Sequence, residues 1–136
     1  SSMGRFMLDT DISSYILRDR PAVVGNRLQR VRAADVCVSV ITEAELLYGV
    51  RMAGGNSELQ RDVDDFLRRL NVLVWDSAAA AEYADIRSDL QGRGAAIGGM
   101  DLMIAAHARS LGATLVTNNE RHFRRVNHLR VENWAR

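Results

Sequence analysis

The chain has 136 residues and a formal net charge of +1, and 47% of its residues are hydrophobic. A chain of this length forms one domain, buries roughly two-thirds of the surface that it exposes when unfolded, and so can build its own core. No apolar run approaches the roughly 18 residues that span a membrane, and no leader sequence is evident, so we expect a cytoplasmic protein. Ser1 and Ser2 are expected to be the remnant of an expression tag, which leaves residues 3–136 as the domain.

Two features of the composition exclude some kinds of chemistry. Cys37 is the only cysteine, so the chain can form neither an internal disulfide nor a metal site built from cysteines, as suits a reducing compartment. All 18 basic residues are arginine and none is lysine. Mechanisms that need a lysine side chain, such as Schiff-base formation or the phosphate-binding lysine of a P-loop, are therefore excluded.

The first predicted strand covers residues 5–8, a short apolar run that ends at Asp9. A short helix should follow it, with Asp11 or Ser13 as the N-terminal cap. Residues 23–31 carry apolar side chains at helical spacing and predict a second helix.

The second predicted strand covers residues 36–40, which are rich in valine. Thr42 is expected to open a helix that turns three residues toward the core, namely Ala44, Leu47 and Val50. After a glycine-containing loop, residues 57–70 predict another helix with one continuous apolar stripe.

The third strand is predicted at residues 72–75, and Asp76 or Ser77 should cap the long alanine-rich helix that follows. Residues 91–99 are expected to form a loop with four glycines. Asp101 should then open the next helix, which is mostly apolar.

A fourth strand is predicted at residues 113–117 and, after a short turn or helix, a fifth at residues 129–131. Strands that alternate with helices indicate a parallel sheet covered on both faces. We therefore expect an α/β fold, a three-layer α/β/α sandwich around a central parallel sheet of four to five strands. In such sheets the ligand crevice lies beyond the carboxyl ends of the strands.

Acidic and amide side chains occur where several of these elements begin or end. Asp9 follows the first strand, Asn118 and Asn119 follow the fourth, Glu45 lies in the helix after the second, and Asp101 opens an otherwise apolar helix. Taken singly, an acid at such a position can be a helix cap or a favourable charge at the positive end of a helix.

Gathered in one crevice, these carboxylates would repel one another and raise their own pKa values. A divalent cation relieves that repulsion, and Mg²⁺ prefers hard oxygen ligands, of which a few carboxylates suffice. Such a cation can activate a water molecule and stabilise the charge that develops on a phosphate. The pattern therefore favours metal-assisted attack on a phosphoester.

Four segments carry a resemblance to a known family: FMLDTD at residues 6–11, TEAELLYG at 42–49, GMDLMIAAHA at 99–108 and LVTNN at 115–119. In order and spacing they resemble the successive motifs of PIN-domain ribonucleases, and they are closest to the VapC-type toxins of bacterial toxin–antitoxin pairs. The resemblance covers almost the whole chain. It implies a PIN fold and a metal-dependent endoribonuclease toxin.

The resemblance also implies roles for individual residues. Asp9 and Asp101 match metal-binding acids of the family, and Glu45 matches an acid that reaches the metal directly or through water. The expected cofactor is Mg²⁺, with Mn²⁺ as the alternative. Three further residues are expected to support the site: Thr10, Thr117 and Asn118.

The chain departs from the family at Asn119, where many relatives carry an aspartate. Asparagine offers a carbonyl oxygen but no charge, so we keep Asn119 as the fourth member of the catalytic set and expect one metal ion rather than two. Whether the adjacent Glu120 supplies the missing charge is left open. Asp11 stands where many relatives have asparagine, and Glu43 falls at a variable position.

Residues 121–130 hold four arginines, two histidines and no acid. A basic segment beside a metal crevice suits an RNA backbone, because arginine pairs with phosphate, although the segment can equally be a solvated charge run. The candidate RNA contacts are Arg93, Arg121, Arg124 and Arg125. We interpret His107 as a packed histidine rather than a catalytic base, because it lies nearly opposite Asp101 around its helix.

The apolar stripes at residues 23–31 and 59–70 can simply belong to the core. In VapC-type proteins such helices form a groove for the antitoxin, so the resemblance implies a VapB-like antitoxin that places a side chain at the acidic crevice. It also implies a homodimer and a structured RNA substrate, with transfer RNA favoured because some relatives cut it.

Two other functions stay open. A strand followed by Asp9 also opens haloacid-dehalogenase-like phosphatases, but their chemistry normally uses a lysine, which this chain lacks. Loss of the fourth acid can instead mark a PIN fold that binds RNA or a partner without cutting it.

Overall fold

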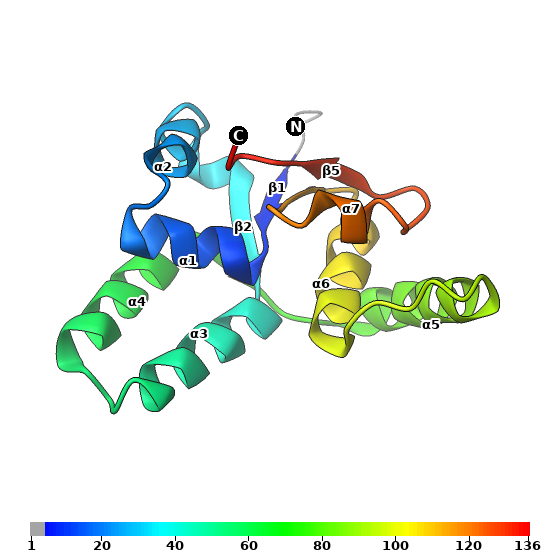
Figure 1. Cartoon of the computed structure of the whole chain (residues 1–136), viewed down its shortest axis with the longest axis horizontal. Coiled ribbons are helices and arrows are strands. Elements are labelled where there is room, and N and C mark those ends of the chain that lie inside the picture. The colour runs from blue at the N-terminus through cyan, green and yellow to red at the C-terminus, as the bar shows by residue number, and fades with distance from the viewer. Residues whose placement is uncertain (1–4) are drawn as a thin grey trace.

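Five parallel strands form the centre of the molecule. The computed structural model describes residues 5–136, so the predicted tag remnant at Ser1 and Ser2 lies outside it (Figure 1). The strands are β1 (Phe6–Leu8), β2 (Val36–Ser39), β3 (Asn71–Leu73), β4 (Thr114–Val116) and β5 (Arg130–Glu132). They pair in the order β3-β2-β1-β4-β5, and every pair is parallel. The predicted parallel sheet is confirmed, with five strands.

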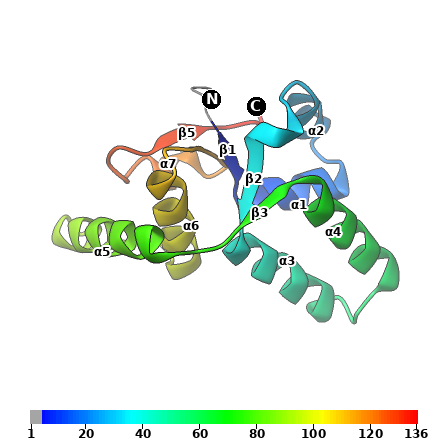
Figure 2. The ribbon, with the colours of Figure 1, turned by 180° about the vertical axis from the view of Figure 1, so that it is seen from behind.

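Helices cover both faces of this sheet. The first group is α1 (Thr10–Arg18), α2 (Ala22–Gln29), α3 (Val40–Met52) and α4 (Ser57–Arg69). The second group is α5 (Ser77–Gly92), α6 (Gly99–Ser110) and the short α7 (Glu120–Phe123). Figures 1 and 2, taken from opposite sides, show α1 to α4 on one side of the strands and α5 and α6 on the other. The fold is therefore the expected three-layer α/β/α sandwich.

Each face of the sheet has its own core, because successive side chains of a strand point to opposite faces. Met7 and Leu115 pack among residues of α5 and α6. Leu8 and Val116 pack on the other face, among residues of α1 to α4. His107 of α6 is only 1% exposed. Its Nδ1 lies 2.8 Å from the hydroxyl of Ser39 at the end of β2. His107 is thus a packed histidine, and burial lowers its pKa.

The strand order reverses between β1 and β4. From β1 the chain moves outward to β2 and β3, then returns to β4 on the other side of β1. Ligand sites in open α/β sheets lie at such a reversal, outside the carboxyl ends of the strands. Here the backbone N–H of Asp9 donates to the carbonyl of Val116 at 3.0 Å, so the residues after β1 and β4 are held side by side.

The beginnings of three helices differ from the prediction, and one of these is α6, which begins at Gly99 rather than Asp101. Asp9 caps α1, rather than Asp11 or Ser13, because its carboxylate accepts the N–H of Ile12 at 2.8 Å. The third helix starts at Val40 instead of Thr42, because the hydroxyl of the preceding serine accepts a backbone N–H of the first turn.

The face that α3 turns toward the core also differs from the prediction. Leu46 and Val50 are buried, whereas Ala44 is exposed and Leu47 is 38% exposed. The observed strand boundaries differ from the predicted ones by one or two residues. None of the helices in the described part of the chain combines the length and hydropathy needed to cross a membrane.

Candidate active site

Asp9 follows β1 directly and is almost completely buried, with 3% of its surface exposed. Its carboxylate accepts the N–H of Ile12 and also a hydrogen bond from the hydroxyl of Thr117. Burial, together with the smaller effects of the charges of Asp11 and Asp101, raises the pKa of Asp9 to about 7, although these two hydrogen bonds lower it. The fold therefore holds an acid whose negative charge the surrounding protein stabilises poorly.

Thr117 joins Asp9 to the turn after β4. The residue is fully buried, and its hydroxyl oxygen accepts the backbone N–H of Asn119 at 2.9 Å while it donates to Asp9. A hydroxyl can do both at once, which a purely accepting or donating side chain cannot. Thr117 therefore fixes the orientation of the Asp9 carboxylate relative to β4.

Glu45 comes from α3 and is half-buried. Thr10, the first residue of α1, donates a hydrogen bond to Oε1 of Glu45. The Thr10 hydroxyl also lies 3.2 Å from that of the buried Thr42. These contacts attach α3 to the beginning of α1, directly beside Asp9.

Asp101 lies in the first turn of α6 and is half-buried. The helix is capped at Gly98 without any side-chain hydrogen bond, so Asp101 is not its N-cap. The Asp101 carboxylate lies 3.6 Å from Nε2 of His122 on α7. Burial raises the pKa of Asp101, the contact with His122 lowers it, and the charges of Asp11 and Glu45 raise it.

The charges of acids from several elements act on one another. Asp101 raises the pKa of Asp9, and Glu45 raises that of Asp101, although the three residues come from different elements. Asp11 affects both Asp9 and Asp101. Like charges so close together favour a bound cation over the metal-free state.

The donor set suits a hard divalent cation, although the side chains do not enclose one. Within residues 5–136, no three His, Cys, Asp or Glu side chains converge closely enough to hold a metal ion by themselves. Mg²⁺ commonly binds through one or two carboxylates and keeps several water molecules. Asp9 and Asp101 fit direct ligands of that kind, and Glu45, which is engaged by Thr10, fits a contact through water.

The charge of Glu120 is already compensated by other residues. Its carboxylate forms ion pairs with Arg124 at 2.9 Å and Arg136 at 2.6 Å, and it accepts a hydrogen bond from Asn133 at 2.9 Å. The hydrogen bonds from Asn133 and Arg124 lower the pKa of Glu120. This arrangement favours a structural role for Glu120 at the start of α7 over that of a fourth acid.

The two asparagines after β4 lie at the exposed edge of the crevice. Asn118 donates to the hydroxyl of Tyr15 at 3.1 Å and accepts from Asn133 at 3.3 Å, so its side chain is engaged away from the acids. Asn119 contacts the site through its backbone N–H, which Thr117 accepts.

Two of the arginines expected at the RNA hold a loop of the protein itself. Arg93 pairs with Asp89 at 2.7 Å and donates to the carbonyl of Arg125 at 2.6 Å. Arg125 in turn donates to the carbonyl of Ala96 at 3.2 Å. The loop between α5 and α6 is therefore fastened to the segment after α7. Arg121, by contrast, is exposed on α7.

The sequence analysis assigned no site role to Asp11 or His122, which both act on Asp101. Asp11 carried a usable signal, because it lies two residues after Asp9 at the start of the same helix. His122 carried none, because only the packing of α7 brings it to an acid that lies 21 positions earlier in the chain.

Comparison with known sequences identifies the family. The model of the PIN domain family matches residues 6–129. Ribonuclease VapC2 of Haemophilus influenzae is 42% identical over 133 residues, which cover 98% of this chain and 100% of that protein. The tRNA(fMet)-specific endonuclease VapC of Shigella flexneri is 39% identical over the same length and coverage.

Solved structures agree with this assignment. The crystal structure of DNA-bound VapBC from Salmonella typhimurium matches with a TM-score of 0.91 and 36% identity, covering 97% of this chain and 99% of that chain. A second match is the crystal structure of VapBC2 from Rickettsia felis bound to a DNA fragment from its promoter. It has a TM-score of 0.88 and 36% identity, and the match covers 95% of this chain and 98% of that chain. This chain therefore belongs to the PIN domain family and, within it, to the VapC ribonucleases.

Proposed function

We propose that the protein is a Mg²⁺-dependent endoribonuclease toxin that cuts structured RNA, with transfer RNA as the favoured substrate. The observation that carries this proposal is the buried Asp9 at the end of β1, on which the charge of Asp101 acts, while the charge of Glu45 acts on Asp101. The relative from Shigella flexneri, which is named for its action on tRNA(fMet), supports the choice of substrate.

The residues of the crevice divide the chemistry between them. Asp9 and Asp101 would hold Mg²⁺ or Mn²⁺, with Glu45 bound directly or through water. When bound there, the ion activates water and stabilises the negative charge that builds up on the phosphate. Thr117 orients Asp9 and Thr10 orients Glu45, so both acids are in place before the RNA arrives.

Replacing either principal acid by its amide tests the catalytic assignment. We expect Asp9→Asn and Asp101→Asn each to lower Mg²⁺-dependent cleavage of transfer RNA by at least about 100-fold, because each removes a charged ligand of the cation. Glu43→Gln, at the variable position beside Glu45, is the matched control and should cut at the wild-type rate. Cleavage is measured by gel electrophoresis of end-labelled RNA, with folding checked by circular dichroism.

Unchanged cleavage by a folded Asp9→Asn variant would contradict this assignment. If the wild-type protein binds RNA but does not cut it, the alternative of a PIN fold that only binds would be favoured. An acyl-phosphate trapped on Asp9 would instead support the phosphatase alternative.

The raised pKa of Asp9 predicts a pH dependence of stability in the metal-free protein. The folded state keeps the proton up to about pH 7, whereas the unfolded chain loses it near its ordinary pKa of roughly 4. Folding therefore binds a proton between these values, and the free energy of unfolding should fall by about 1.4 kcal/mol per pH unit as the pH rises through this window.

The Asp9→Asn variant isolates this contribution, because asparagine can still cap α1 but carries no charge. In denaturant titrations with a chelator, the stability of the variant relative to the wild type should increase from pH 4 to pH 7. Added Mg²⁺ should restore the stability of the wild type at pH 7 and leave that of the variant unchanged. A difference that is independent of pH would show that Asp9 is not a strained, protonatable acid.

We also propose that a VapB-like antitoxin occupies the groove between α1, α3 and α4. A cavity of about 390 Å³ there has an apolar floor that includes Leu46 and Val63, and it reaches Asp11 and Glu45 of the acidic crevice. A neighbouring cavity of about 270 Å³ between α1, α2 and α4 continues it past Leu28. An amphipathic segment fits such a groove, and the Salmonella and Rickettsia neighbours are VapBC complexes. The homodimer stays a prediction.

Gly49 offers a way to block the groove without touching the acids. It lines the cavity, and a Cβ there meets no atom within 4 Å. We expect Gly49→Phe to fill the groove, retain RNA cleavage and bind a cognate antitoxin at least about tenfold more weakly, measured by calorimetry. The control Gly49→Ala should keep antitoxin binding and gain about 0.5–1 kcal/mol of stability. Tight antitoxin binding by a folded Gly49→Phe variant would place the partner elsewhere.

A further inference from the structure

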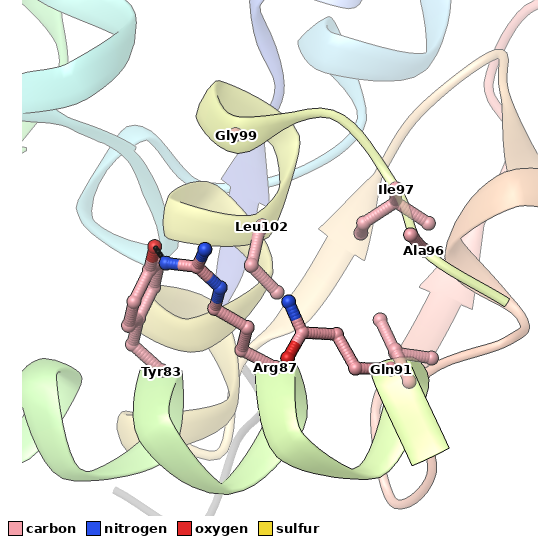
Figure 3. Close-up of a pocket in the computed structure, with 8 residues that line it drawn as sticks. Tyr83, Arg87, Gln91, Ala96, Ile97, Gly99 and Leu102 are labelled. Atoms are coloured by element: carbon pink, nitrogen blue, oxygen red, sulfur yellow. Dashed lines mark hydrogen bonds between the residues drawn. The ribbon is translucent and has the colours of Figure 1, made fainter. Parts of the chain in front are cut away.

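A cavity of about 340 Å³ opens between α5 and α6, on the opposite side of the sheet from the groove at α1, α3 and α4 (Figures 1 and 3). Its apolar lining comes from Leu90, Ile97 and Leu102, and its polar lining from Tyr83, Arg87 and Gln91. The volume lies at the lower end of the range for pockets that hold a small ligand, about 300–1,000 Å³.

The guanidinium of Arg87 is the charged group of this cavity. It donates to the hydroxyl of Tyr83 at 2.9 Å and lies 5.8 Å from the centre of the Tyr83 ring. Within residues 5–136, Arg93 and Arg109 form ion pairs with acids of α5, whereas Arg87 forms none. Arg87 is thus oriented by a neutral partner and keeps its charge available to a ligand.

Gln91 adds a second planar polar group to the same wall. It follows Arg87 by one helical turn, and both side chains extend into the space between α5 and α6 (Figure 3). Its carboxamide can donate and accept hydrogen bonds. Leu90, from the same helix, and Leu102, from α6, form a buried apolar surface of the cavity. The cavity therefore combines hydrogen-bonding groups with an apolar platform, as a flat heterocycle requires.

The cavity lies at the beginning of α6, the helix that carries Asp101. Gly99 and Leu102, which both line it, lie in the first turns of α6 on either side of Asp101. Its outer wall is held in place, because the carbonyl of Ala96 accepts a hydrogen bond from Arg125 and Arg93 fastens Arg125. An RNA strand bound at Asp101 would pass this preformed cavity.

We propose that the cavity binds a nucleobase of the RNA next to the phosphodiester that is cut, and that guanine is the base that it matches. The inference rests on the proposed function, because the cavity acts as a subsite of the same crevice. Arg87 can donate two N–H groups to O6 and N7 of guanine. The carboxamide of Gln91 can form hydrogen bonds with the other polar atoms at the edge of the base. An unstacked base in an RNA loop can lie against the Tyr83 ring and the apolar floor.

A binding experiment without catalysis tests the cavity alone. Guanosine 5′-monophosphate is titrated into the metal-free chain and followed by NMR. We expect chemical-shift changes at the methyl groups of Ile97 and Leu102. Adenosine and cytidine monophosphates should bind at least about tenfold more weakly than guanosine 5′-monophosphate. Arg87→Met and Gln91→Leu should each weaken binding by about ten- to a hundredfold, whereas Arg61→Met on α4 should not change it.

A cleavage experiment separates the failure of this inference from that of the proposed function. In RNA hairpins that differ at one base beside the cut, the wild type should cut the hairpin with guanine faster, whereas Arg87→Met should cut both hairpins at equal rates. Asp9→Asn should cut neither hairpin but still bind guanosine 5′-monophosphate.

Three outcomes would overturn the inference: no shifts in the wild type, shifts that Arg87→Met leaves unchanged, or perturbation of the cavity by the antitoxin rather than by the nucleotide. If guanosine 5′-monophosphate binds as expected while Asp9→Asn cuts normally, the catalytic assignment of Asp9 fails and the nucleobase site stands.

Discussion

The buried carboxylate of Asp9 is the constraint on which the crevice depends. Asp9 lies at the carboxyl end of the middle strand, and its side chain caps α1. Its backbone N–H donates a hydrogen bond to the carbonyl of Val116, the last residue of β4. The same burial, with a smaller contribution from the neighbouring acids, raises its pKa to about 7. The geometry that orders the strands and α1 therefore also creates a site at which a cation relieves an unfavourable charge.

The two helical layers supply different surfaces to this crevice. On one side, α1, α3 and α4 leave an apolar groove that ends at Asp11 and Glu45, which suits a protein partner that closes the site. On the other side, α5 and α6 leave a smaller cavity beside Asp101, with Arg87 as its charged group. If both proposals hold, the partner and the substrate bind on opposite helical layers of the sheet.

The sequence predicted those parts of the fold and site that depend on local pattern. Apolar runs that stop at an acid located β1 and Asp9, and an acid in an apolar helix singled out Asp101. Long-range contacts were not predictable in this way: His122 reaches Asp101 only through the packing of α7, and Arg136 compensates Glu120 from the end of the chain. Leu47 was assigned to the core because spacing defines a helical face but not which face meets the sheet.

The central claim is that Asp9, Glu45 and Asp101 share a single hard cation. The most direct test is to titrate Mn²⁺ into the isotope-labelled chain and measure paramagnetic broadening of each amide signal by NMR. We expect one ion per chain, with the strongest broadening at the amides of these three residues and little in α2, and we expect Asp9→Asn to abolish this pattern. Broadening centred elsewhere, or a pattern that survives in Asp9→Asn, would contradict it.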